Sequence, residues 1–331
     1  MNNTGHMTNA GRPGLIDKAM DAAIVPGFTK IGYRVRKRRW QPMAESLAGR
    51  TVVITGATGG LGRAAALDLA RLGADVVMIG RSPPKTARVR DEIATEAGRG
   101  SVRVELADLS IMAEVRGLAE RLLANESAIH VLINNAGTLF NERSETVEGI
   151  EKTLATNLLG HFLLTNLLIP LLVESAPARI INVASGGMYG QRISIGNLHN
   201  DRGEYKGAAA YARTKRGQVI LTEMWAERLR DTGVTVNAMH PGWADTPGVA
   251  HSLPTFHKIT KPFLRTPSEG ADTVVWLAAS ADVEGRTGLF WHDRRPRPTH
   301  RSRRTKELPE ARQDLWDALT ELSVESTGEL P

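Results

Sequence analysis

Seven short apolar runs divide the middle of the chain, and the stretches between them are mostly long enough for a helix. Most of the runs are continuous and do not alternate between apolar and polar positions, as expected for parallel strands buried on both faces. The pattern predicts an α/β fold in which a doubly wound, seven-stranded parallel sheet carries helices on both faces. The runs cover residues 51–55, 76–80, 102–106, 131–134, 179–184, 234–239 and 287–291.

One predicted helix, over about residues 207–231, contains no proline and has an apolar side. Ala212, Val219 and Ala226 recur at seven-residue intervals, which is typical of a buried helix face. Tyr211 and Lys215 then lie one turn apart on the same face of this helix.

Residues 158–173 form the most apolar stretch of the chain. His161, Asn166 and Pro170 interrupt it, and it is shorter than the roughly 20 apolar residues that a membrane span needs. We therefore expect a buried or interface helix here. The first residues show no apolar region followed by a small-residue cleavage site, so no signal peptide is expected.

The alternation of strands and helices begins near residue 51 and stops near residue 293. It predicts a Rossmann-type domain over 51–293, a basic N-terminal extension over 1–50, and a basic segment with an acidic C-terminal helix over 294–331. On that last helix, Leu315, Trp316 and Leu319 form an apolar stripe that we expect to dock on the core.

The 331 residues include no cysteine, which excludes disulfides, thiolate nucleophiles and cysteine-ligated zinc. We expect a cytoplasmic protein and predict no metal site. The net charge of +6 combines +6 in residues 1–50, +7 in residues 286–306 and −7 in the remainder. Because the positive charge belongs to terminal segments and no nucleic-acid-binding motif accompanies it, no nucleic-acid partner is expected.

The first predicted strand runs into TGATGGLG, residues 55–62, and then into an alanine-rich helix. Gly56, Gly60 and Gly62 let the backbone turn tightly and approach a pyrophosphate, whose charge the first amides of the helix can receive. The spacing is GxxxGxG and not GxGxxG. A strand, this turn and a helix in that order predict a nucleotide-binding site.

Several motifs in one order make the chain resemble the short-chain dehydrogenase/reductase family from about residue 51 to residue 246. TGATGGLG is similar to that family's TGxxxGxG turn, NNAG at 134–137 to its fourth-strand signature, and YARTK at 211–215 to its YxxxK. Asn157, Ser185, the Pro241–Gly242 pair and Thr246 also match family positions. The cofactor-binding residues that the resemblance implies are Gly56, Thr58, Gly60, Leu61, Gly62, Arg81, Asp108, Leu109, Asn135, Ala136, Gly137, Tyr211, Lys215, Pro241, Gly242 and Thr246.

The same resemblance implies that Asn157, Ser185, Tyr211 and Lys215 carry catalysis. A phenol with a pKa of about 10 is a poor acid or base at neutral pH, so Tyr211 needs positive charge nearby, which Lys215 and an oxidised nicotinamide would supply. Tyr211 would protonate a carbonyl oxygen in reduction, or take an alcohol proton in oxidation. Ser185 would bond the same oxygen, Lys215 would also hold the nicotinamide ribose, and Asn157 would position a water beside the lysine.

The end of the second strand predicts which cofactor is preferred. Gly80 stands where NAD-preferring relatives have an acidic residue, and Arg81 follows it. A guanidinium without a carboxylate favours a ribose 2′-phosphate, so NADPH is predicted over NADH. Arg63 either adds charge there or lies on a helix surface. Asp108 either binds adenine or caps a helix before Ser110.

A second YxxxK pattern, Tyr33 to Lys37, lies ahead of the first strand. Five basic residues stand in six positions there, so composition alone accounts for the spacing. The arm over residues 24–40 either contacts an anionic membrane peripherally or packs on its own domain. Its apolar residues are Ile24, Val25, Phe28, Ile31 and Trp40.

Ser185 and Tyr211 are 26 residues apart, about twice the usual family spacing. The long connection resembles that of retinol-dehydrogenase-like members. YARTKRGQVILTEMWAE, MHPGWADTPGV and FWHDRRPRPTH resemble the dehydrogenase/reductase member twelve group more closely still. This kinship favours a hydrophobic small-molecule substrate, as do the apolar residues of the insertion, which are Met188, Ile193, Ile195 and Leu198.

Residues 294–304, RRPRPTHRSRR, follow the last predicted strand. We expect a solvated linker, with contact to an acidic substrate or to cofactor phosphates as the alternative.

The combined prediction is an NADP-dependent oxidoreductase that interconverts a carbonyl and an alcohol, and a homo-oligomer is compatible with it. The alternative is a cofactor-binding, membrane-associated scaffold or redox sensor with little turnover. The intact Ser185, Tyr211 and Lys215 argue against that alternative.

Overall fold

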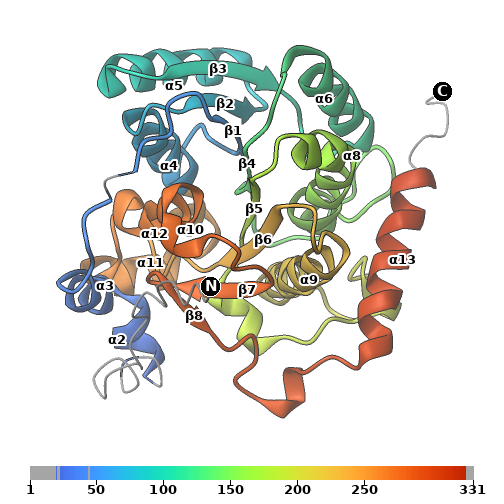
Figure 1. Cartoon of the computed structure of the whole chain (residues 1–331). Coiled ribbons are helices and arrows are strands. Elements are labelled where there is room, and N and C mark those ends of the chain that lie inside the picture. Colours follow the sequence, from blue (N-terminus) through green and yellow to red (C-terminus); the bar gives the residue numbers. More distant parts are fainter. Residues whose placement is uncertain (1–19, 21–22, 44, 326–331) are drawn as a thin grey trace, which may run out of the picture.

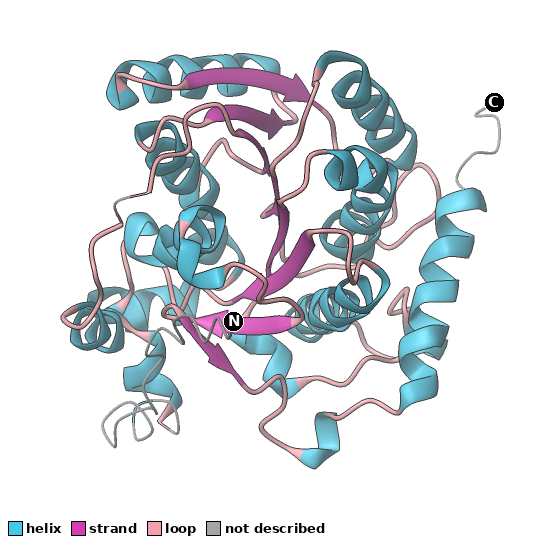
Figure 2. Cartoon of the chain, in the orientation of Figure 1, coloured by secondary structure: helices cyan, strands magenta, loops and turns pink. Residues whose placement is uncertain are grey.

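The computed structural model describes residues 20, 23–43 and 45–325, and its centre is an eight-stranded sheet (Figures 1 and 2). The strand order is β3-β2-β1-β4-β5-β6-β7-β8. The first seven strands are parallel, and β8 is antiparallel to β7. The strands are β1 (Thr51–Thr55), β2 (Asp75–Gly80), β3 (Ser101–Leu106), β4 (Val131–Asn134), β5 (Ala178–Val183), β6 (Val234–Met239), β7 (Leu289–His292) and β8 (Arg295–Arg297).

Helices cover both faces of the sheet, which gives three layers (Figure 1). One face carries α4 (Gly60–Arg71), α5 (Pro83–Ala97) and α12 (Pro267–Ala279). The other carries α6 (Met112–Asn125), α8 (Gly160–Glu174) and α9 (Gly207–Arg228), with α13 (Pro309–Glu325) packed outside them. The doubly wound fold expected from the sequence is confirmed.

Burial on both faces explains the continuous apolar runs. In β1, Val52 and Ile54 join the core beneath α4 and α12, whereas Val53 joins the core beneath α6 and α8. Successive side chains of a strand point to opposite faces, and here each face has its own covering helices. Alternation is therefore absent from the buried strands, whereas the edge strand β3 has no buried residue and alternates at most of its positions. The positions of all seven predicted strands are close to those observed.

The apolar stretch over 158–173 is a buried helix, as expected. It lies mostly in α8, which follows one turn of π-helix at Ala155–Leu159. By length and composition alone, the helical region Lys152–Glu174 is apolar enough to cross a membrane. In this fold 67% of its most apolar 18-residue stretch is buried inside the protein. The region is therefore a helix of the core.

The eighth strand was not predicted, because β8 comes from the basic segment expected to be a solvated linker. That expectation is wrong for Arg295–Arg297, whose strand pairs Pro296 with Trp291. The two residues of the connecting turn, Asp293 and Arg294, have φ of 52° and 56°. Such left-handed pairs usually contain glycine or asparagine, and here ion pairs hold the turn: Asp293 with Arg265 (2.6 Å) and Arg294 with Asp272 (2.8 Å).

The N-terminal arm packs on its own domain through α2 (Ile24–Phe28) and α3 (Lys30–Lys37). Phe28 and Tyr33 are buried, so Phe28 is not free to meet a membrane. Val25 and Ile31 are 60% and 45% exposed. Peripheral membrane contact through residues 24–40 stays a prediction.

The C-terminal helix docks on the core as expected. Leu315 and Leu319 of α13 are fully buried. The Trp316 ring lies 5.0 Å from that of Phe162 and 6.1 Å from that of Trp225. The apolar stripe thus covers α8 and α9 and stabilises the helix that carries Tyr211.

Candidate active site

The four predicted catalytic residues meet at the carboxyl edge of the sheet, where ligands bind in open α/β folds. Ser185 follows β5, Tyr211 and Lys215 lie one turn apart on α9, and Asn157 lies on the π-helical turn before α8. Tyr211 and Ser185 share a side-chain hydrogen bond. The Lys215 ammonium lies 5.6 Å from the centre of the Tyr211 ring.

Tyr211 is set up as a proton donor. Burial raises the pKa of its phenol, and the hydrogen bond with Ser185 lowers that pKa by less. The hydroxyl therefore keeps its proton at neutral pH in the free protein. A protonated phenol beside a second hydroxyl is the arrangement needed to hydrogen-bond and then protonate an oxygen atom.

Lys215 is buried without a carboxylate partner among the described residues. Its Nζ donates to the Val183 carbonyl oxygen (2.8 Å) and to Gln218 Oε1 (3.0 Å). Burial lowers the pKa of Lys215 to about 7, so the amine can change its charge near neutral pH. An ammonium has three N–H groups, and two of them are engaged, which leaves one for a ligand.

A chain of polar side chains continues behind Lys215. Gln218 Nε2 donates to the Asn157 carbonyl oxygen (2.9 Å) and lies 3.1 Å from His161 Nδ1. On its other side, His161 Nε2 lies 3.1 Å from Thr55 Oγ1. Burial, aided by the charge of Lys215, lowers the pKa of His161 to about 3, so its ring is neutral. Sequence reasoning missed Gln218 and His161, although Gln218 is three positions after Lys215 on the same helix.

Asn157 uses its side chain to hold the neighbouring loop. Its Oδ1 accepts from Thr138 N and its Nδ2 donates to Thr138 O, both at 2.8 Å. Asn157 lies on the π-helical turn, a feature often found at functional sites, and its carbonyl oxygen contacts both Gln218 Nε2 and His161 Nδ1. The water-positioning role implied for Asn157 stays a prediction.

A cleft of about 460 Å³ runs along the glycine turn. Gly56 and Gly60 have φ of 66° and 52°. A Cβ at Gly62 would lie 2.3 Å from the Gly56 carbonyl oxygen, so only glycine permits the turn. Asn135 Nδ2 donates to Thr55 O (2.8 Å) and ties β1 to the end of β4. The predicted residues that line this glycine cleft are Gly56, Thr58, Gly60, Leu61, Gly62, Arg81, Asp108, Leu109, Asn135, Ala136, Gly137 and Thr246.

The outer end of the glycine cleft is basic and has no room for the acidic side chain of NAD-preferring relatives. A Cβ at Gly80 would lie 2.3 Å from Thr86 Oγ1. Arg81 lines the cleft, and so does Lys85, which sequence reasoning missed.

The surroundings of Arg63 and Asp108 bear on the alternatives left open for these two residues. Arg63 pairs with Glu92 (3.3 Å) and Glu96 (3.6 Å) and does not line the glycine cleft, which favours the helix-surface interpretation. Asp108 does not cap a helix, because α6 begins at Met112 with Ile111 as its N-cap residue. Its Oδ1 accepts from Ser110 N (2.9 Å) in the loop before α6. Asp108 lines the glycine cleft, and its binding of adenine stays a prediction.

A second cavity of about 420 Å³, the apolar cavity, adjoins the glycine cleft and contains Ser185, Tyr211 and Lys215. The two share Leu61, Asn135, Gly137, Thr138, Thr246 and Gly248, so they are continuous. Pro241 and Gly242 line the apolar cavity, and its apolar wall comes from Leu139, Trp243, Val249, Leu253 and Phe256.

The apolar residues of the insertion do not form that wall. Met188 and Ile193 are buried in the cores, and Ile195 and Leu198 pack against the core beneath α8 and α9. None of the four lines the apolar cavity. These four side chains anchor the insertion to the protein core. Their use in the sequence analysis as evidence for a hydrophobic substrate was therefore wrong.

Tyr33 and Lys37, the second YxxxK pair, line neither the glycine cleft nor the apolar cavity. Tyr33 is buried under the arm, where its hydroxyl donates to Asp272 Oδ2 (3.4 Å) and Lys37 lies 5.4 Å from its ring centre. Burial raises the pKa of this phenol. The pattern there is a result of composition and packing.

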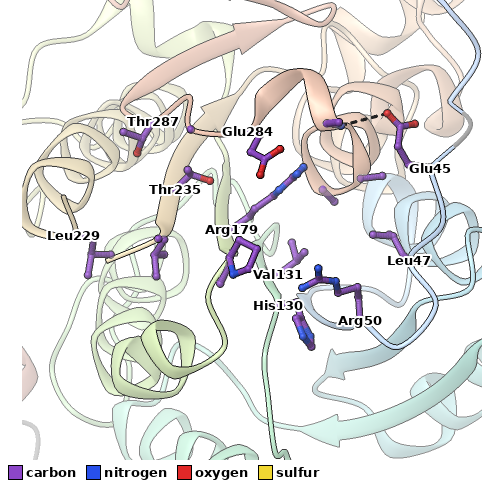
Figure 3. A pocket seen from close by; sticks show the side chains of 18 of the residues that line it. Glu45, Leu47, Arg50, His130, Val131, Arg179, Leu229, Thr235, Glu284 and Thr287 are labelled. Atoms are coloured by element: carbon purple, nitrogen blue, oxygen red, sulfur yellow. Dashed lines mark hydrogen bonds between the residues drawn. The ribbon is translucent and has the colours of Figure 1, made fainter. Parts of the chain in front are cut away.

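Another cavity, of about 760 Å³, lies at the opposite, amino-terminal edge of the sheet (Figure 3). Figure 3 shows Arg50, His130 and Arg179 on its walls together with Glu45 and Glu284. None of the predicted site residues lines it. The predicted catalytic residues therefore lie at the opposite edge of the sheet from this cavity.

Comparison with known proteins agrees with this site. Residues 50–255 match the family model described as short chain dehydrogenase. The chain is 38% identical over 300 residues to dehydrogenase/reductase SDR family member 12 of Bos taurus, covering 89% of this chain and 94% of that protein. It is 38% identical over 281 residues to retinol dehydrogenase 12 of Bos taurus, covering 83% and 87%.

Solved structures show the same likeness. A crystal structure of a protein from Mycobacterium paratuberculosis superposes with a TM-score of 0.68 at 30% identity, over 85% of this chain and 95% of that one. The active-site complex of Pseudomonas aeruginosa RhlG with NADP gives a TM-score of 0.61 at 28% identity, over 74% and 94%. With its glycine cleft and its Ser185, Tyr211 and Lys215, the chain belongs to the short-chain dehydrogenase/reductase family of NAD(P)-dependent oxidoreductases.

Proposed function

We propose that the protein is an NADPH-dependent oxidoreductase that interconverts a carbonyl and an alcohol on a hydrophobic small molecule. One observation carries the proposal: Ser185, Tyr211 and Lys215 lie in the apolar cavity, which opens into the glycine cleft. A carbonyl carbon in the apolar cavity would meet a nicotinamide at that junction.

The protein's own residues would move and hold the proton. When bound, NADPH supplies the hydride that the carbonyl carbon receives. Tyr211 donates its phenolic proton to the oxygen, and the Ser185 hydroxyl hydrogen-bonds the same oxygen. The phenolate left behind is stabilised by the Lys215 ammonium, and the reverse transfers oxidise the alcohol.

The preference for NADPH rests on the outer end of the glycine cleft. Arg81 and Lys85 bring two cations to it, and the Thr86 and Thr58 side chains around Gly80 leave no space for an acidic side chain at that position. A 2′-phosphate gains charge-assisted hydrogen bonds from such groups, whereas a ribose hydroxyl finds no acceptor at Gly80.

The substrate class rests on the wall of the apolar cavity. The Trp243 and Phe256 rings lie 5.1 Å apart edge to face, with Val249 and Leu253 beside them. Such a wall suits a lipophilic body with one oxygen directed at Tyr211. Retinol dehydrogenases among the relatives support a lipophilic alcohol or aldehyde.

The proposal is tested by titrating the protein with NADPH and NADH, and then by following NADPH consumption with a panel of aldehydes, ketones, retinoids and sterols. We expect tighter binding of NADPH and turnover of at least one lipophilic carbonyl. NADPH binding without turnover of any panel member would instead favour the scaffold or redox sensor.

A further inference from the structure

A buried imidazole, His240, joins the two loops that flank the apolar cavity. It follows β6, and its Nδ1 accepts from Gly186 N (3.0 Å) and from Gly242 N (3.3 Å). Gly186 is the residue after Ser185, and Gly242 follows Pro241. One nitrogen atom thus fixes the backbone next to Ser185 and the backbone of the Pro241–Gly242 turn.

These contacts also define which nitrogen of His240 carries the proton. Since Nδ1 accepts from two amides, the proton lies on Nε2. Nε2 is buried and has no hydrogen-bond partner within the described part of the chain. A Cβ at Gly186 would lie 2.8 Å from His240 Nε2 and 2.8 Å from Phe28 Cε2. The imidazole and the phenyl ring therefore meet over this glycine. An N–H group beside an aromatic ring makes only a weak contact.

The N-terminal arm and the end of β7 both pack against the His240 ring. Phe28 packs edge to face on it, with ring centres 4.4 Å apart. The His292 ring stacks on the His240 ring with centres 4.6 Å apart, and it also contacts the Phe28 ring at 5.2 Å. His292 Nε2 lies 3.2 Å from the Gly27 carbonyl oxygen. The Phe28 carbonyl oxygen in turn accepts from Trp243 N (2.7 Å), and Trp243 lines the apolar cavity.

An ionic cluster fixes the arm at this place. Asp293 accepts from Arg36 (2.6 Å) and from Arg265 (2.6 Å), and all three side chains are buried. Arg36 and Arg265 also donate to the Gly27 carbonyl oxygen, at 2.9 and 3.2 Å. These hydrogen bonds fix the position of the Gly27 and Phe28 backbone.

We propose that His240 is a positioning residue for Ser185, and that Phe28 of the N-terminal arm holds His240 in place. The arm is then part of the catalytic unit, although it precedes the Rossmann-type domain. The proposal rests on the proposed function, because it concerns the orientation of the Ser185 hydroxyl. It leaves Tyr211 as the proton donor.

Two substitutions of His240 separate hydrogen bonding from packing. In His240→Asn the amide oxygen can take the place of Nδ1 as acceptor, while the ring is lost. In His240→Phe a ring remains, while the acceptor is lost. We expect hydrogen–deuterium exchange over residues 185–190 and 240–246 to rise about tenfold in His240→Phe. In His240→Asn we expect exchange close to that of the wild type.

The kinetic test places the effect on Ser185. We expect His240→Phe to lower kcat about tenfold and His240→Asn to restore most of that loss. In a double variant with Ser185→Ala, the substitution of His240 should add almost nothing to the loss from Ser185→Ala alone. Additive losses in the double variant, or equal kcat in His240→Phe and His240→Asn, would overturn the proposal.

The arm is tested with Phe28→Ala, and Phe263→Ala is the control because Phe263 is 50% exposed and outside both cavities. We expect Phe28→Ala to raise exchange over both segments, as His240→Phe does, and Phe263→Ala to leave it unchanged. If the wild type turned over no panel substrate, the proposed function would fail, and exchange alone would still decide whether His240 and Phe28 fix the two loops. Unchanged exchange in His240→Phe or Phe28→Ala would overturn the proposal.

Discussion

At the scale of single residues, burial controls the charges around Tyr211. It lowers the pKa of Lys215 to about 7 and raises that of Tyr211. In the free protein both groups are thereby shifted toward their neutral forms. Proton donation by Tyr211 creates a phenolate, whose negative charge then favours the charged form of Lys215. The proton that charges Lys215 then comes from solvent, because the proton of Tyr211 has gone to the carbonyl oxygen.

The proposed preference for NADPH rests on two cations, Arg81 and Lys85, at the outer end of the glycine cleft. We expect Arg81→Ala and Lys85→Ala each to weaken NADPH binding about tenfold, because each removes a charged donor to the 2′-phosphate. NADH binding should change little. Fluorescence titration with both cofactors measures this, and Arg63→Ala is the control, since Arg63 pairs with Glu92 and Glu96. Equal losses for NADPH and NADH would refute the assignment.

His161 is expected to make the folded protein less stable at acidic pH. Its folded-state pKa is about 3, against an ordinary value of 6.5, so below pH 6.5 the unfolded chain binds a proton that the folded protein does not. The free energy of unfolding therefore falls as the pH falls through this window, by up to about 1.4 kcal/mol per pH unit.

The variant His161→Gln isolates this effect. It removes the titrating group and keeps an amide that can contact Thr55. The free energy of unfolding of both proteins is measured with urea at about pH 7.5 and about pH 5. We expect the difference between wild type and variant to be smaller by about 2 kcal/mol at the lower pH, because only the wild type loses stability through His161. A constant difference at both pH values would show that His161 is not the group responsible.

At the scale of elements, the glycine turn has no tolerance for a side chain. In Gly62→Ala the new Cβ would lie 2.3 Å from a backbone oxygen, so the turn must move. We expect NADPH binding to weaken at least about tenfold and stability to fall by about 1–3 kcal/mol. In the control Gly117→Ala, within α6, the nearest atom is the flexible end of Arg121 at 3.4 Å. This control should gain about 0.5–1 kcal/mol of stability and bind NADPH normally. Similar behaviour of the two variants would contradict the role given to Gly62.

The elements that sequence alone located were those with a local signature. The buried strands showed as apolar runs, α9 showed by its spacing, and Tyr211 and Lys215 were found because they lie one turn apart. The elements it missed depend on distant partners. β8 exists because the Asp293–Arg294 turn is held by Arg265 and Asp272, from α12 and the loop before it. No local sequence pattern predicts ion pairs between residues so far apart in the chain.

The candidate site divides in the same way. Ser185 and the glycine turn follow strands, so their place at the carboxyl edge could be predicted. Lys85, Gln218 and His240 have no motif that the sequence could reveal, because each acts through a neighbour brought close only by folding. The apolar insertion misled the sequence analysis, since Met188 and Ile193 are apolar for packing and not for binding.

At the scale of the whole molecule, both extensions belong to the folded unit (Figure 1). The arm is held by Arg36 at Asp293, and α13 covers α8 and α9. Arg301 of the basic segment lies over the rings of both Phe28 and Tyr189, at 5.4 and 4.7 Å. The arm, the insertion after Ser185 and the C-terminal segment thus meet behind the active site.

The central claim, that Tyr211 donates the proton in an NADPH-dependent reduction, is tested most directly by Tyr211→Phe. Its turnover of the best panel substrate is compared with that of the wild type, and its affinity for NADPH is measured in parallel. Tyr33→Phe is the control, because Tyr33 has the same lysine four residues on but lies outside both cavities. We predict that Tyr211→Phe loses about 10²- to 10⁴-fold in kcat with NADPH affinity nearly unchanged, while Tyr33→Phe keeps its activity. Normal turnover by Tyr211→Phe would contradict the account.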